Sequence, residues 1–299
     1  MQDSGWLWAV FTVIAAASQT ARNAMQRELT ATLGTAGATH VRFLFGFPFA
    51  VVFLLGVLLA GGSGLPNPPL SFWPWIVLGA GAQVAATALM LAAMSERSFV
   101  VTIAYIKTEP VQVALFGLIF LGDLLSIGMI SAILIATAGV VVMSLKPGGA
   151  PATSWRPTML GLGAGAMFAL SAVGYRGAIL SLSLDNFVLA ATFTLVVGLL
   201  MQAAVLSLWL WLREPQVMRA IFAAWRPSVL AGFMGALASQ FWFLAFALAT
   251  AASVRTLALV EVLFAQAISR FVFGQKTTPR EALGIVLVVA GVALLIWMH

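Results

Sequence analysis

Ten runs of apolar residues divide this chain, and each is close to the length of a helix that spans a lipid bilayer. A spanning helix needs about 20 predominantly apolar residues. The runs cover residues 6–22, 37–60, 72–94, 98–121, 126–145, 157–180, 187–212, 227–249, 252–273 and 280–297. The sequence therefore predicts an all-α integral membrane protein with ten transmembrane helices.

The composition supports a surface that faces lipid. Hydrophobic residues make up 62% of the 299 residues and charged residues 8%, whereas soluble chains average about 45–50% and about 25%. A soluble domain of this size needs a polar coat, which so few charged residues do not supply. The chain has no cysteine, so disulfides and thiolate metal sites are excluded, and we expect no cofactor.

The net charge of +6 indicates either nucleic-acid binding or basic loops on one side of a membrane. The basic residues lie in or beside the odd-numbered connections between runs: Arg22, Arg27, Arg97, Lys146, Arg156, Arg213, Arg219, Arg226, Arg270, Lys276 and Arg280. The even-numbered connections contain Asp123 and Asp185 and no basic residue. Basic loops face the cytoplasm. This distribution predicts cytoplasmic odd loops, both termini outside and no nucleic-acid partner.

Residues 1–5 include Asp3 and lack the basic residues of a secretory signal, so we expect the first run to be retained as a helix. Tryptophan marks the expected membrane interfaces. Nine tryptophans lie near the ends of predicted spans: Trp6, Trp8, Trp73, Trp75, Trp155, Trp209, Trp211, Trp225 and Trp297. Trp242 lies well inside a span, where it either packs against lipid or other helices or forms a wall of a substrate cavity.

The two halves of the chain resemble each other. When the sequence is shifted by 152 residues, identical residues align at three informative positions: Trp73 with Trp225, Glu109 with Glu261, and Gly122 with Gly274. We therefore divide the chain into two five-helix repeats, residues 1–149 and 150–299. Because five is an odd number, the second repeat must enter the membrane in the opposite sense to the first. Such inverted repeats are typical of secondary transporters.

Charged residues within the predicted spans are the strongest candidates for a functional site. Each costs at least ~2.5–3.5 kcal/mol in a bilayer core, so it faces a cavity or a partner. Glu109 and Glu261 fall near the middle of the fourth and ninth spans, where they either line a transport path or form an internal ion pair. Lys107 lies roughly 200° around the helix from Glu109, so its partner should come from elsewhere. Arg255, near a helix start, is expected to reach the interface.

Other polar residues within spans extend the predicted substrate path, either as cavity residues or as contacts between helices. They are Tyr105, Tyr175, Trp242 and Gln83. Pro110 is expected to kink the fourth helix, at a gate or as tolerated packing. A polar cluster at the end of the first span and the start of the second is either simple interface or a gate on the odd-loop side: Arg22, Asn23, His40 and Arg42.

The segment Gly161-Leu162-Gly163-Ala164-Gly165 has the spacing of a phosphate-binding loop. It follows no predicted strand and lies in an apolar span, so nucleotide binding is rejected. Small residues at this spacing predict close helix packing instead.

Two segments resemble the repeated signature of the EamA family in the drug/metabolite transporter superfamily. They run from Phe120-Leu121-Gly122-Asp123 to Gly139-Val140-Val141 and from Phe273-Gly274-Gln275-Lys276 to Gly291-Val292-Ala293. The Glu109-Pro110 pair is similar to the proline-bearing stretch of that family's fourth helix. The family usually has Glu after the turn glycine, where this chain has Asp123 and Gln275. The resemblance implies ten helices, an inverted repeat and a central cavity lined by helices 1, 3, 4, 6, 8 and 9.

The resemblance also implies export of metabolites, notably amino acids, and it often goes with termini inside the cell. We therefore predict a non-enzymatic, multi-pass exporter of the bacterial inner membrane. Its expected substrates are amino acids, aromatic ones included, moved by alternating access with or without protons. An exporter of hydrophobic cations is the alternative, for which Glu109 or Glu261 would be essential. An intramembrane enzyme is more remote, because the sequence offers no convergent nucleophile, base or metal set.

Overall fold

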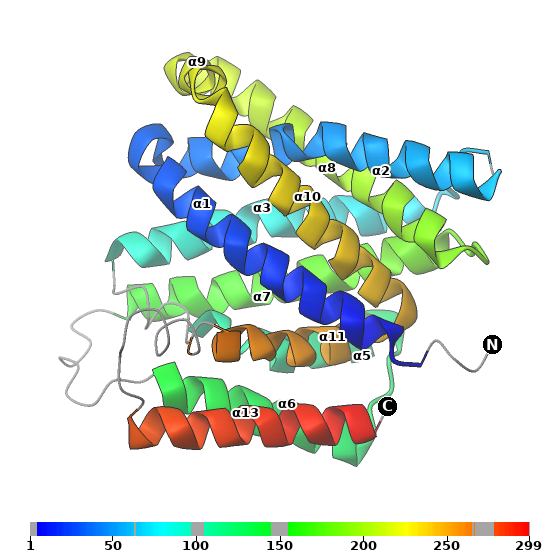
Figure 1. The fold of residues 1–299 in the computed structure, drawn as a ribbon, viewed down its shortest axis with the longest axis vertical. Helices are drawn as coiled ribbons and strands as arrows, with labels where there is room; N and C mark the ends of the chain where they lie inside the picture. The colour runs from blue at the N-terminus through cyan, green and yellow to red at the C-terminus, as the bar shows by residue number, and fades with distance from the viewer. Residues whose placement is uncertain are drawn as a thin grey trace. The chain divides into compact units, whose positions relative to one another are not determined.

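The computed structural model describes residues 5–62, 64–96, 105–144, 155–264, 266 and 278–298. Every regular element in these ranges is a helix (Figure 1). Within them, six helical stretches are long and apolar enough to cross a membrane: Glu28–Gly61, Phe72–Met90, Thr158–Ser181, Phe187–Arg213, Trp225–Leu248 and Pro279–Trp297. These helices indicate a multi-pass, all-α membrane protein.

Eight of the described helices begin within two residues of the positions that hydropathy predicts. Two of them, α1 (Leu7–Leu44) and α11 (Ala251–Leu257), are described below, and six follow the predicted runs more closely. These six are α3 (Phe72–Glu96), α6 (Ile127–Ser144), α7 (Arg156–Ser181), α8 (Phe187–Arg213), α10 (Trp225–Leu248) and α13 (Pro279–Trp297). Local capping fixes two of these starts. The Asn186 side chain accepts hydrogen bonds from the first turn of α8, and Thr278 and Glu281 form a capping box at α13.

The first helix is longer than predicted. The expected loop over residues 23–36 does not form, because α1 runs from Leu7 to Leu44 with one non-helical residue, Gly34, at φ 68° and ψ 178°. Residues 23–33 contain neither glycine nor proline, the residues that most often break a helix. The helical backbone hydrogen bonds therefore continue through this polar segment. At Gly34 the chain turns back (Figure 1), and the Gln26 side chain on the first arm donates to the Ala38 carbonyl on the second at 3.0 Å.

The predicted second span, 37–60, is divided between the second arm of α1 and α2 (Gly46–Gly61), with Phe45 between them. Pro48 in the first turn of α2 has no N–H to continue the ladder toward the preceding helix, which explains the break. The predicted loop between α8 and α10 contains a short helix, α9 (Pro215–Ala223), which hydropathy alone did not predict.

The fourth and ninth predicted spans both depart from regular α-helix where the structure describes them. Residues 105–106 are helical, Lys107 and Thr108 form a turn, and α5 covers Glu109–Leu121. In the other half, α11 (Ala251–Leu257) is followed by a short 3-10 helix, η1 (Ala258–Val260). The remaining parts of these two spans, residues 98–104, 265 and 267–273, lie outside the described residues, as do Gly274 and Lys276 of the predicted repeat.

The chain forms two compact units. The first, called the α1 unit, comprises Trp6–Val84 and Gly174–Leu248; the second, the α5 unit, comprises Met1–Gly5, Ala85–Val173 and Ala249–His299. Within the α1 unit, α1 lies along α10, and α8 packs against α2 and α10. Within the α5 unit, α6 lies along α13, and α11 packs against α5 (Figure 1). Each unit therefore takes helices from both halves of the sequence.

Glycines allow the helices of each unit to approach closely. In the α1 unit, a Cβ atom on Gly174 would lie 2.6 Å from the Gly79 nitrogen, so α7 and α3 meet backbone to backbone. In the α5 unit, a Cβ on Gly139 would lie 2.8 Å from the Gly284 carbonyl oxygen, and one on Gly291 would lie 2.6 Å from the Ala136 nitrogen. This packing through small residues is typical of helices in membranes.

Candidate functional site

Four charged side chains meet in the α5 unit as two crossed ion pairs. Lys107 pairs with Glu261, and Arg255 Nε lies 3.2 Å from Glu109 Oε1. The four side chains are between 11% and 16% exposed, so both pairs are largely buried. Each pair joins a residue of the first half to a residue of the second, and the four charges sum to zero. Removing a single partner would leave a buried charge uncompensated.

Each carboxylate of this cluster directly follows a departure from regular α-helix. Glu109 begins α5 directly after the turn at Lys107 and Thr108. Glu261 directly follows η1. A carboxylate in the first turn of a helix is favoured by the exposed N–H groups and the helix dipole. Pro110 occupies the same first turn, where its missing N–H removes no hydrogen bond, so it starts the helix instead of kinking its middle as predicted.

The geometry decides between several sequence-based interpretations. The expectation that Lys107 finds its partner outside its own helix is confirmed. The interpretation of Glu109 and Glu261 as members of internal ion pairs between the fourth and ninth spans agrees with these contacts, since each carboxylate pairs with a cation of the other span. The expectation that Arg255 reaches the membrane interface is wrong, since it lies inside the unit against Glu109. The buried Glu109 carboxylate competes with hydrated lipid headgroups for the Arg255 guanidinium. A hydropathy profile does not reveal that such a carboxylate lies nearby.

Tyr105 packs close to this cluster through the glycine stripe of α7. A Cβ on Gly161 would lie 2.8 Å from Tyr105 Cβ, and one on Gly165 would lie 3.4 Å from the Ile106 carbonyl oxygen. The prediction that this stripe serves close helix packing is therefore confirmed. The stripe holds the segment immediately before Lys107 against α7.

A buried network of amides and one tyrosine lies in the α1 unit. The Tyr175 hydroxyl on α7 donates to Gln83 Oε1 on α3 at 3.1 Å. Gln202 Nε2 on α8 donates to the same Gln83 oxygen at 2.8 Å and to the Ala80 carbonyl at 3.1 Å. The Tyr175 ring also contacts Phe243 of α10, with ring centroids 4.5 Å apart. The network ties four helices together and brings together two predicted path residues, Tyr175 and Gln83.

Trp242 is buried in the same unit and is held by a polar contact. Its Nε1 donates to Gln19 Oε1 on α1 at 3.1 Å, and its ring stacks on Phe246 with centroids 6.3 Å apart. The Phe246 carbonyl accepts a hydrogen bond from Arg176 Nη1 at 2.6 Å. Trp242 therefore faces α1 and its own helix neighbours, and the lipid-facing alternative is wrong.

The four predicted gate residues do not form one cluster at a helix end. Because α1 continues past them, Arg22 and Asn23 lie within its first arm, and His40 and Arg42 lie within its second. Arg22, His40 and Arg42 are buried, whereas Asn23 is exposed and accepts a hydrogen bond from Arg22 Nη2 at 2.8 Å. His40 Nε2 lies 2.9 Å from the Ser207 hydroxyl of α8.

Arg22 and Arg42 approach the same point of α10. A Cβ on Gly235 would lie 3.1 Å from Arg42 Cγ and 3.5 Å from Arg22 Cδ. The turn at Gly34 brings the two arginines together, since it folds one arm of α1 back on the other. The aliphatic parts of both side chains therefore lie over the same stretch of α10. A guanidinium group can bind a carboxylate through paired N–H donors.

Sequence reasoning missed three partners in these networks: Thr192, Gln202 and Ser207. Gln240 Nε2 donates to Thr192 Oγ1 at 2.8 Å. Each is a polar residue inside an apolar run, which is a detectable signal, since a polar side chain within a span requires a partner. The sequence does not say which partner it takes.

A pocket of about 480 Å³ lies between the turn of α1 and the start of α9. Its lining includes Thr32, Gly34, Thr35, Glu214, Gln216 and Val217. None of the predicted path or gate residues lines it, so it is separate from the two buried clusters.

Comparison with known proteins shows the fold and leaves the substrate open. No family model matches the chain, and no curated protein matches it. One solved protein, described as "Crystal structure of protein", is similar over 97% of this chain and 97% of its own, with a TM-score of 0.70 and 16% sequence identity. At this identity the likeness shows a shared fold alone.

Proposed function

We propose that this chain is a secondary transporter that exports small metabolites, specifically amino acids, by alternating access through a central cavity. The crossed ion pairs of Lys107 with Glu261 and Arg255 with Glu109 carry the proposal. They combine buried charge with two spans that depart from regular α-helix beside the charges. Secondary transporters place interrupted helices and buried charges at their substrate and coupling sites.

Helix positions support the proposed architecture of ten spans in two inverted repeats, residues 1–149 and 150–299. The starts of α3 and α10 differ by 153 residues (225 − 72), and those of α6 and α13 by 152 (279 − 127). Glu109 and Glu261 also differ by 152; Glu109 follows a two-residue turn and Glu261 follows one turn of 3-10 helix. Two similar halves of opposite sense can close either side of a membrane at nearly equal energy, which is the physical basis of alternating access.

Two features favour amino acids as the substrate class. Arg22 and Arg42, whose side chains both pass over Gly235, supply cationic groups that suit a carboxylate. The buried aromatic side chains Tyr175, Trp242 and Phe243 suit an apolar or aromatic side chain. The cation-exporter alternative needs a carboxylate that a substrate cation can reach. Glu109 and Glu261 already pair with Arg255 and Lys107, so such a substrate would have to displace a tethered cation.

Uptake of labelled phenylalanine and threonine into proteoliposomes of the purified chain tests the proposal. Empty liposomes are the control, and each measurement is made with and without a pH gradient. Saturable uptake that excess unlabelled amino acid suppresses is expected, and its response to the gradient reveals whether protons are coupled. Uptake of a lipophilic cation with none of either amino acid would overturn the amino-acid assignment in favour of cation export.

A further inference from the structure

An exposed surface of arginine and aromatic side chains surrounds α9, at the corner between α8 and α10. We call it the α9 surface. Its residues are Trp211, Arg213, Arg219, Phe222, Trp225 and Arg226, and all are exposed. Trp211 is 72% exposed, Phe222 56% and Trp225 53%. The Arg226 guanidinium lies 5.5 Å from the centre of the Trp225 ring.

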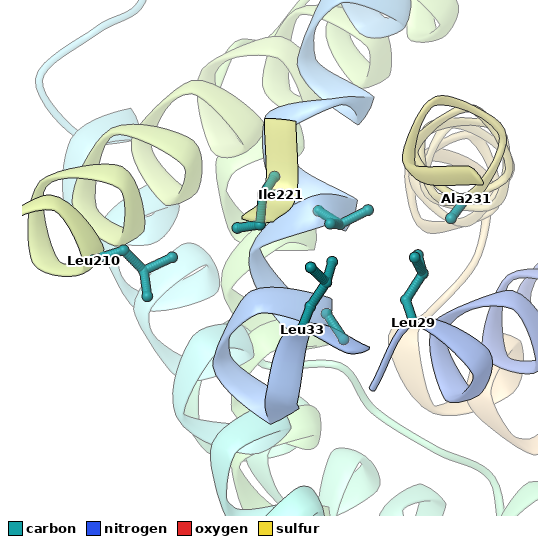
Figure 2. Packing of buried hydrophobic residues seen from close by; sticks show 7 residues of the cluster. Leu29, Leu33, Leu210, Ile221 and Ala231 are labelled. Carbon is teal, nitrogen blue, oxygen red and sulfur yellow. The ribbon is translucent and has the colours of Figure 1, made fainter. Parts of the chain in front are cut away.

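One face of α9 packs into the α1 unit, so the opposite face of the helix points away from the core of that unit. Ile221 is fully buried and belongs to a cluster that includes Leu29 and Leu33 of α1 and Leu210 of α8 (Figure 2). Val217, one turn before Ile221, packs against the same cluster. Helical periodicity then turns Arg219 and Phe222 outward.

The place of α9 in the chain puts this surface near the membrane boundary. It joins the end of α8 at Arg213 to the start of α10 at Trp225, and both helices are apolar enough to span a bilayer. Tryptophan and arginine at the ends of such helices lie at the level of the lipid headgroups. A nine-residue amphipathic helix between them is about 13–14 Å long, enough to contact more than one headgroup.

We propose that the α9 surface binds anionic phospholipid headgroups. The three arginines supply donors for lipid phosphate, and Phe222 and the tryptophans contact the glycerol and upper acyl region. The corner contains one carboxylate, half-buried Glu214, so positive charge predominates. Exposed aromatic side chains interleaved with arginines favour a lipid surface over a soluble acidic partner, because they gain by entering the acyl boundary. The proposal is independent of what the chain transports.

Titration of short-chain phosphatidylglycerol into the full-length protein in neutral detergent tests this assignment. Phosphatidylcholine of equal chain length is the reference, and native mass spectrometry counts bound lipids. The test variant is Arg213→Gln/Arg219→Gln/Arg226→Gln. The control variant is Arg156→Gln/Arg280→Gln, which removes two exposed arginines at the starts of α7 and α13. A second variant carries lysine at the same three positions, which keeps the positive charge. Retained lipid binding in this variant would show that replacing the three arginines does not by itself disrupt the fold.

We expect the native protein to prefer phosphatidylglycerol at low salt. Each arginine near a membrane surface contributes roughly fivefold to binding, so the triple glutamine variant should bind it roughly a hundredfold more weakly. The lysine variant and the control should retain most of the affinity. Equal affinity for the two lipids, unchanged binding by the glutamine variant, an equal loss in the control, or displacement of the lipid by inorganic phosphate would each overturn the proposal.

Discussion

Arg255 of α11 lies 3.2 Å from Glu109 of α5, so a cation of the second half neutralises a carboxylate of the first. Lys107 and Glu261 repeat the arrangement with the roles of the halves exchanged. Two helical segments that are far apart in sequence are thus held together by charge.

The Arg255–Glu109 pair should be strongly coupled energetically. Arg255→Gln or Glu109→Gln alone leaves a largely buried charge without its partner, and we expect each to lower the unfolding free energy by roughly 3–5 kcal/mol. The double variant should lose less than the sum, with a coupling of about 1–3 kcal/mol. Chemical unfolding in detergent measures all three. Exposed Arg213→Gln is the control, expected to change stability by about 0.5 kcal/mol or less. Additive losses would show that the two residues are not coupled.

The same charges should be needed for transport if they serve the substrate path. Glu261→Gln keeps the shape of the side chain but weakens its bond to Lys107. Because charge-assisted hydrogen bonds contribute about 1.5–3 kcal/mol, we expect the initial rate of amino-acid uptake to fall by roughly tenfold or more. The same is expected for Glu109→Gln. Rates are compared at a temperature where both variants remain folded, with the exposed carboxylate variant Glu28→Gln as the control. Native rates in both path variants would remove these carboxylates from the mechanism.

Hydropathy predicted helix positions well because the bilayer length constrains them. The runs 72–94 and 187–212 become α3 and α8 with starts that match. It failed where polar residues did not end a helix. Arg22 and Asn23 looked like a membrane boundary, but backbone hydrogen bonds continue through them to Leu33, and only Gly34 changes the direction of the chain.

The candidate site was predictable as a set of residues and not as a set of contacts. A charge inside an apolar run signals that a partner exists, which selected Lys107, Glu109 and Glu261. Spacing around one helix excluded a contact between Lys107 and Glu109. The identity of each partner depends on tertiary packing between distant segments, and no local pattern in the sequence encodes it. The same limit applies to Gln202, whose partners lie on another helix.

Gly34 should be intolerant of any side chain, although space is available. Its φ of 68° and ψ of 178° fall in a region that is essentially restricted to glycine, and nothing lies within 4 Å of the position that a Cβ atom would take. We expect Gly34→Ala to lower stability by about 1–3 kcal/mol through backbone strain. Gly56→Ala in α2 is the matched control, since its surroundings are equally open and its conformation is helical. Thermal unfolding should show a loss for the first and none for the second; equal melting temperatures would contradict the strain.

The crossing of α3 and α7 should depend on Gly174. A methyl group there would lie 2.6 Å from the Gly79 nitrogen, 2.8 Å from its Cα and 3.0 Å from the Trp75 carbonyl oxygen, and none of these backbone atoms can move freely. We expect Gly174→Ala to lower the unfolding free energy by about 1–3 kcal/mol, because the added methyl group forces the two helices apart. Gly81→Ala, on α3 with open space around it, should gain up to about 1 kcal/mol of stability from helix propensity.

Because Tyr175 follows Gly174 directly, separation of α3 and α7 should also weaken the hydrogen bond from Tyr175 to Gln83. Tyr175→Phe should therefore lower the unfolding free energy less in the Gly174→Ala variant than in the native chain. An equal loss in both would show that the crossing of α3 and α7 does not position the tyrosine.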